Sequence, residues 1–147
     1  MNESLWLDEA TTALVSKMSL SEIFAKFLPN DFHPPLYYIV MKFWVSIFGN
    51  SEISLRFPSL IFALLTIYTV YKLSGKVSAL LLATAPLLFY YAQEARMYSL
   101  VTLLTAYLVY SYIKKKWLLF SVFLVLVGLT DYVALLIIPV FWIFEYK

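Results

Sequence analysis

Long apolar runs separated by short polar turns fill the chain from residue 51 onward. The runs cover 57–73, 77–92, 97–113, 117–130 and 133–144. A full span needs about 20 apolar residues, so runs of this kind predict helices that cross or enter a bilayer. The last two runs are short and are separated by Asp131, which is therefore expected below the membrane surface. The pattern predicts about five spans or half-spans over 51–147.

The first 50 residues have a different pattern, in which apolar residues recur at helical spacing among polar ones. This spacing predicts one short helix over 9–18. A second helix is expected to start at the capping box Ser19-Leu20-Ser21-Glu22 and to end at Pro29. Both are too short and too polar to span, which is typical of amphipathic helices in the membrane interface. Residues 1–50 are therefore interpreted as an outer loop.

A third helix, expected over 36–48 and ended by Gly49-Asn50, decides the topology. Its apolar part is about 13 residues, short of a span. If it stays in the interface, Lys72, Lys76 and Lys114–Lys116 share one side, which the positive-inside rule makes cytoplasmic. The opposite side then gathers Asp8, Glu9, Asp31, His33, Glu52, Arg56, Gln93, Glu94, Arg96 and Asp131. If it spans, the membrane separates Asp8 from the arginines.

We adopt the first arrangement, because it obeys the charge rule and gathers the polar residues. The predicted fold is an all-α, polytopic membrane helical bundle behind an amphipathic outer loop. Of the 147 residues, 63% are hydrophobic and 14% charged, more apolar surface than a soluble domain of this length can bury. We therefore expect a multi-pass protein of the cell membrane whose solvent is the lipid bilayer.

Charge and composition also exclude several classes of function. The net charge is +2 and no basic tract occurs, which argues against nucleic-acid binding. There is no cysteine, so disulfide and thiol chemistry are excluded. No Gly-rich phosphate loop is present, and no nucleotide cofactor is indicated.

Two adjacent carboxylates, Asp8 and Glu9, stand between apolar flanks near the start of the chain. In one interpretation Asp8 is an N-cap and Glu9 sits favourably in the first helical turn. In the other, Asp8 is a catalytic base or a metal ligand at the membrane surface. These residues alone leave both interpretations open.

Other polar residues suit chemistry on an anionic lipid. Arginine offers a bidentate fork to phosphate, which makes Arg56 and Arg96 candidate phosphate ligands. Carboxylate oxygens suit divalent Mg or Mn, so Asp8, Glu9 and Asp31 are candidate metal ligands.

Each of these polar residues also has a structural interpretation. Arg56 can pair with Glu52 one turn earlier on a helix. The charges of 94–96 can be interfacial side chains that extend toward water, and His33 can be only a turn residue. Asp131 is the hardest to explain structurally, because acidic residues within a membrane are usually functional.

Four motifs occur in order and at a familiar spacing. They are Leu5-Trp6-Leu7-Asp8-Glu9-Ala10, Asp31-Phe32-His33-Pro34-Pro35-Leu36-Tyr37-Tyr38, Phe48-Gly49-Asn50-Ser51-Glu52-Ile53-Ser54-Leu55-Arg56-Phe57-Pro58-Ser59 and Tyr91-Ala92-Gln93-Glu94-Ala95-Arg96-Met97-Tyr98. Together they resemble the N-terminal part of a membrane glycosyltransferase of the GT-C fold. The resemblance is to the dolichyl-phosphate-mannose-protein mannosyltransferase-like group (glycosyltransferase family 39), and it covers almost the whole chain.

The resemblance implies roles for individual residues. Asp8 would be the catalytic carboxylate, with Glu9 beside it. His33 would lie near the carrier phosphate, and Arg56 and Arg96 would match arginines of the family's outer-face motifs. The further substrate-binding candidates are Glu94, Tyr98 and Asp131. The pair Asp131-Tyr132 departs from the family pattern, which often has His before Tyr.

The activity implied by the resemblance is transfer of a sugar from a polyprenyl- or dolichyl-phosphate carrier to a protein, lipid or glycan acceptor on the outer face, with inversion. Asp8 would take the acceptor proton, while arginines, His33 or a metal ion stabilise the leaving phosphate. The family has a span before its Asp-Glu loop and more spans after this region, so we expect a fragment that needs a partner chain to supply missing helices. The alternative is a non-catalytic membrane fragment, an assembly subunit or a small transporter.

Overall fold

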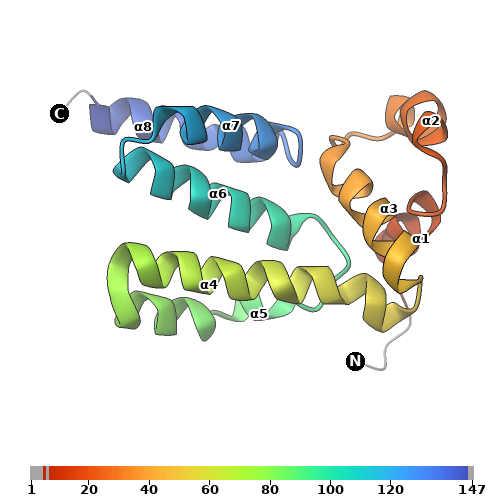
Figure 1. Cartoon of the computed structure of the whole chain (residues 1–147), viewed down its shortest axis with the longest axis horizontal. Helices are drawn as coiled ribbons and strands as arrows, with labels where there is room; N and C mark the ends of the chain where they lie inside the picture. The colour runs from red at the N-terminus through yellow and green to blue at the C-terminus, as the bar shows by residue number, and fades with distance from the viewer. Residues whose placement is uncertain (1–4, 6, 146–147) are drawn as a thin grey trace.

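The structure is a computed structural model that describes residue 5 and residues 7–145, except for the side chains of residues 144 and 145. Every regular element in this described part is a helix, as expected. Figure 1 shows two groups of helices: α1, α2 and α3 pack against one end, while α4 to α8 run back and forth beside one another. Trp6 of the first motif lies outside the described residues.

The helices of the first group lie close to where the sequence predicts, but the first begins before the predicted residue 9 and ends before residue 18. Helix α1 covers Leu7–Val15. The predicted capping box is confirmed at the start of the short helix α2 (Leu20–Glu22). Ser19 Oγ accepts a hydrogen bond from the Glu22 N–H, and the Glu22 carboxylate accepts one from the Ser19 N–H. Pro29 does not end this helix. It lies inside the 3₁₀ turn η2 (Leu28–Asn30), after the π turn η1 (Ile23–Phe27), because a proline at the first positions of a turn forfeits no bond.

Helix α3 covers Leu36–Phe48, as predicted, and Gly49, with a φ of 78°, ends it. Only a residue that tolerates positive φ fits such an end without strain. The N–H of Leu36 donates to the Leu129 carbonyl at 3.0 Å, so the start of α3 is fixed to the turn after α7. Tyr37, Tyr38 and Met41 are buried against the bundle.

Helix α4 (Glu52–Ala83) contains Pro58 in its first part. A proline removes the helical hydrogen bond to the carbonyl four residues earlier, here Ser54. The Trp44 indole N–H donates to that carbonyl at 2.8 Å. This bond satisfies the orphaned carbonyl and holds α3 against α4.

Gly75 divides α4 into two arms. Its φ of 84° and ψ of −173° are not helical, and Figure 1 shows the chain doubling back at this point. The returning arm leads to α5 (Pro86–Tyr91), where Leu88 and Ala92 pack against Ala63 of the first arm. The prediction of one continuous helix over 77–92 is wrong, because Pro86 excludes the helical conformation at the residue before it.

The remaining helices are α6 (Tyr98–Ile113), α7 (Trp117–Gly128), η3 (Val133–Ile137) and α8 (Ile138–Glu145). Figure 1 shows α7 running antiparallel to both α6 and α8. Among the described helices, α4 alone is long and apolar enough to cross a membrane by length and composition. At about 1.5 Å per residue, its first arm extends about 35 Å, against a bilayer core of about 30 Å.

The two ends of the bundle carry opposite chemistry. Lys72 and Lys76 flank the Gly75 turn, and Lys114–Lys116 follow the end of α6. The start of α4 and the 92–97 loop lie at the other end, together with α1 and α3. The acidic and arginine-containing motifs therefore meet at one end, and Lys72, Lys76 and Lys114–Lys116 lie at the other, which we call the lysine end.

Candidate functional site

The buried junction consists of Glu9, Arg56 and the backbone of Ala95. Arg56 Nε and Nη2 donate to Glu9 Oε1 and Oε2 at 2.9 and 2.7 Å. The Ala95 N–H donates to the same Oε1 at 2.8 Å. The Glu9 side chain is 1% exposed and that of Arg56 8%. Two parallel charge-assisted bonds in a dry setting fix the position of both groups, so one carboxylate joins α1, α4 and the 92–97 loop.

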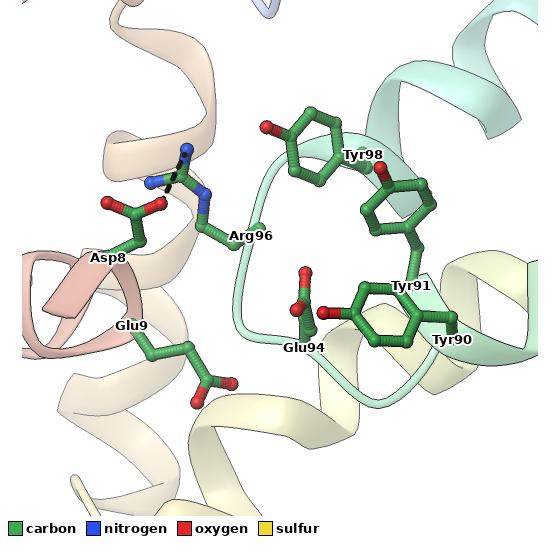
Figure 2. A pocket seen from close by; sticks show the side chains of 7 residues that line it. All are labelled: Asp8, Glu9, Tyr90, Tyr91, Glu94, Arg96 and Tyr98. Atoms are coloured by element: carbon green, nitrogen blue, oxygen red, sulfur yellow. Dashed lines mark ion pairs between the residues drawn. The ribbon is translucent and has the colours of Figure 1, made fainter. Parts of the chain in front are cut away.

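Asp8 faces another environment, although it is the neighbour of Glu9. Consecutive helical residues point about 100° apart, and the Asp8 side chain is 67% exposed. Its Oδ2 lies 3.5 Å from Nη2 of Arg96, the pair marked by the dashed line in Figure 2. Asp8 is the second residue of α1, so the N-cap interpretation is wrong. Its carboxylate is directed at the 92–97 loop.

A cavity of about 230 Å³ opens beside Asp8. We call it the aromatic cavity; it is lined by Asp8, Glu9, Tyr90, Tyr91, Glu94, Arg96 and Tyr98. Figure 2 shows Asp8 and Arg96 on one side, and Glu94 with the tyrosines on the other. The rings of Tyr91 and Tyr98 have centroids 4.4 Å apart, and the Tyr90 hydroxyl points toward the Glu94 carboxylate.

The loop that carries Glu94 and Arg96 is held by its backbone. Ser59 Oγ donates to the Glu94 carbonyl at 2.5 Å, and Ser99 Oγ donates to the Tyr91 carbonyl at 2.9 Å. The Ala95 N–H is also bound to Glu9, so three hydrogen bonds fix the backbone at Tyr91, Glu94 and Ala95. The side chains of the cavity are therefore preorganised by bonds from the loop backbone to Ser59, Ser99 and Glu9.

Arg96 is mostly covered, with 12% of its side chain exposed. Its guanidinium carbon lies 5.6 Å from the centre of the Tyr98 ring. Burial lowers the pKa of Arg96, but the hydrogen bond with Tyr98 and the charge of Asp8 outweigh it, and the net pKa is raised. Since a guanidinium carries five N–H donors, Arg96 retains donors for an anion beside Asp8.

A second polar cluster lies between the 3₁₀ turn and α3. His33 Nδ1 is 2.8 Å from Asp31 Oδ1, and the Tyr38 hydroxyl donates to Asp31 Oδ2 at 2.7 Å. Partial burial raises the pKa of Asp31, yet the bonds from Tyr38 and His33 outweigh it and the pKa lies below its usual value. The charges of Arg96 and Asp8 also act on Tyr38, so this cluster is within electrostatic reach of the cavity.

The family model for dolichyl-phosphate-mannose-protein mannosyltransferases matches residues 32–145. The chain belongs to this family. No curated protein and no solved structure matches the chain. Members of this mannosyltransferase family are membrane-bound glycosyltransferases. The match begins after Asp8 and Glu9, so the placement of those two residues rests on their contacts with Arg56 and Arg96, which lie inside the matched region.

The metal site predicted for this mannosyltransferase-family chain is not assembled. Among the described residues, no group of three or more His, Asp or Glu side chains is placed to hold a metal ion. Glu9 accepts from Arg56 and Ala95, and Asp31 accepts from Tyr38 and lies against His33. Both carboxylates are thus engaged by protein donors, and the set of Asp8, Glu9 and Asp31 does not fit Mg or Mn.

The other predicted site residues divide into two sets. Glu94, Arg96 and Tyr98 line the aromatic cavity with Asp8 and Glu9. Asp131 follows α7, where its Oδ1 accepts from the Val133 N–H at 2.9 Å and starts η3. This contact gives Asp131 a structural role that the sequence did not suggest. Sequence reasoning missed Tyr38, Tyr90 and Tyr91 as site residues, although Tyr38 and Tyr91 lie within predicted motifs and Tyr90 directly precedes one.

Proposed function

We propose that this chain transfers a sugar, a mannosyl group by family membership, from a polyprenyl-phosphate carrier to an acceptor hydroxyl, with inversion at the anomeric carbon. The observation that carries the proposal is the exposed carboxylate of Asp8 beside Arg96 at a small polar and aromatic cavity. An accessible base next to a fixed cation is the arrangement that proton removal and phosphate departure need together.

In the proposed reaction the acceptor oxygen attacks the anomeric carbon while its proton passes to an Asp8 carboxylate oxygen. The bond between that carbon and the phosphate oxygen breaks, and its electron pair leaves with the phosphate. Arg96 donates to the developing phosphate charge, since its guanidinium is already held at the cavity by Asp8 and Tyr98.

The walls of the aromatic cavity suit the sugar. A cavity of about 230 Å³ is of the size of one monosaccharide rather than of a long glycan. The rings of Tyr91 and Tyr98 offer apolar faces to the C–H side of a pyranose, and Glu94 offers carboxylate oxygens to its hydroxyls. We assign Glu94 and Tyr98 to sugar binding, as expected from the motif, and add Tyr90 and Tyr91.

Glu9 and Arg56 serve as positioning residues in this proposal. The Nε and Nη2 edge of Arg56 donates to both carboxylate oxygens of Glu9, so neither that edge nor the carboxylate can act as phosphate ligand or base without dismantling the buried junction. Arg56 therefore affects the substrate indirectly, because its bonds to Glu9 help to fix the positions of α1 and the 92–97 loop. His33, held by Asp31, remains the candidate for a second contact with the carrier phosphate.

We further propose a polytopic placement, with the first arm of α4, its returning arm with α5, then α6, α7 and α8 entering the bilayer. Large aliphatic side chains such as Leu80, Leu118 and Leu136 are exposed on the surface of successive segments. Contiguous apolar surface of this extent requires a lipid or a partner chain. The lysine end would then face the cytoplasm and the aromatic cavity the outer side.

The test is transfer from a radiolabelled polyprenyl-phosphate mannose to a hydroxyl acceptor in membranes that contain the chain together with any helices it needs from a partner. We expect product that depends on the carrier and is lost on Asp8→Asn, while Glu22→Gln, an exposed substitution in α2, transfers normally. Absence of transfer by the wild-type chain in every such assembly, with the chain stably inserted, would favour the non-catalytic alternative.

A further inference from the structure

The lysine end of the bundle carries two neighbouring grooves that the proposed reaction does not use. One, of about 390 Å³, lies between the first arm of α4 and α6 and is lined by Tyr68, Thr69, Lys72, Tyr107 and Tyr110. The other, of about 460 Å³, lies between the two arms of α4. Tyr68 lines both, so its ring is the wall between them.

The groove between the arms of α4 is an apolar slot with a cation at one end. Its sides are Leu64, Ile67, Leu80 and other aliphatic side chains, and Lys76 stands where the arms meet near Gly75. A flexible hydrocarbon chain fits such a slot, because it fills apolar space without presenting polar groups. A soluble anion would leave most of the slot empty.

The second groove places another cation beside the first. Lys72 Nζ lies 5.4 Å from the Tyr68 ring centre and 5.8 Å from that of Tyr71, which keeps the ammonium near the wall between the grooves. Tyr110 adds a phenol from α6. The sequence has no acidic residue in 57–93 or 97–116, so α4 and α6 contain one carboxylate between them, that of Glu52, and it lies at the opposite end of the first arm of α4.

We propose that these grooves form a binding site for one anionic phospholipid, whose phosphate lies between Lys72 and Lys76 and whose acyl chain fills the slot between the arms of α4. Charge complementarity selects an anionic headgroup over a zwitterionic one, and the lysine end is the end that the positive-inside rule places at the anionic leaflet. The inference rests on the membrane placement proposed above, though not on the sugar-transfer activity.

The site is tested with the full chain reconstituted in nanodiscs of phosphatidylcholine that contain a minor share of phosphatidylglycerol. Lipid retained after transfer to a neutral detergent is quantified by mass spectrometry. We expect phosphatidylglycerol to be enriched over its share in the nanodisc. Lys72→Gln and Lys76→Gln should each reduce that enrichment by about fivefold, the contribution of one basic residue near an anionic surface.

As matched control, Lys114→Gln or Lys115→Gln removes one charge, as each groove variant does, at the same end and from a residue that lines neither groove. Enrichment should survive in this control. Equal loss in the control would mean a diffuse basic surface, and would overturn the site. Equal retention of the two lipids by the wild-type chain overturns the lipid site alone. A chain that enters no bilayer overturns the membrane placement and the lipid site together.

Discussion

The buried junction and the aromatic cavity contain the same chemistry, a carboxylate beside an arginine, in opposite settings. Glu9 and Arg56 meet in two short bonds with almost no exposure. Asp8 and Arg96 approach only to 3.5 Å, and the Asp8 carboxylate faces solvent. Because Asp8 and Glu9 are adjacent on α1, the buried pair of Glu9 and Arg56 also fixes the position of Asp8.

This contrast separates stability from reactivity. A dry, fully paired carboxylate contributes to stability, since the loss of either partner leaves an uncompensated buried charge. A carboxylate that is accessible and loosely paired can change its protonation state during a reaction.

Glu9→Gln should destabilise the protein by about 3–5 kcal/mol, because Arg56 is left buried with a neutral partner. Thermal or denaturant unfolding of the chain in detergent measures the loss. The double variant Glu9→Leu with Arg56→Met should regain much of the stability, since two apolar residues leave no buried charge. If the double variant is as unstable as the single one, the junction acts through more than its charge pair.

Asp8→Asn should lower the transfer rate by about a hundredfold or more, the usual scale for removal of a general base, because an amide cannot accept the acceptor proton. Unfolding should be almost unchanged, since the side chain is 67% exposed and makes one long ion pair. Rate and stability are measured on the same preparation. A large loss of stability in Asp8→Asn would erase the contrast with Glu9.

Arg96→Lys should weaken binding of polyprenyl phosphate by about 1–3 kcal/mol, because lysine keeps the charge but loses the planar fork. Arg56→Lys should instead lower stability and change carrier affinity little. Titration with a short-chain polyprenyl phosphate gives both affinities. A larger affinity loss in Arg56→Lys than in Arg96→Lys would exchange the roles of the two arginines.

Tyr38→Phe should have the smallest effect, about 1.5 kcal/mol, the lower end of the range for a hydrogen bond to a charged group, because the bond to Asp31 is only partly buried. The folded state lowers the pKa of Asp31, so this carboxylate stabilises the fold above the ordinary carboxyl pKa, and that contribution is lost as the pH falls below it. Removing the Tyr38 donor raises the folded pKa, so acid unfolding should begin at a higher pH. Stability measured from pH 7 downward checks the shift, with Tyr132→Phe, an exposed tyrosine, as control.

Local sequence signals were enough for the elements that depend on local contacts. The apolar run 36–48 followed by Gly49 defined α3, and the Ser19–Glu22 capping box set the start of α2. The membership of Glu94 and Arg96 in one motif also placed them together at the cavity. These features follow from backbone conformation and from bonds between residues at most a few positions apart, which the sequence displays directly.

Only the tertiary structure decided which arginine each acid meets. Arg56 has Glu52 one turn away along its helix, yet it pairs with Glu9, because burial strengthens a fully bonded pair far more than an exposed helical contact. The break at Gly75, in contrast, lies in the gap between the predicted runs 57–73 and 77–92, so the sequence had already indicated it. Sequence alone determined that two carboxylates stand together on one turn. The fold determined that Glu9 is buried and Asp8 is exposed, since exposure depends on segments that lie far apart in the chain.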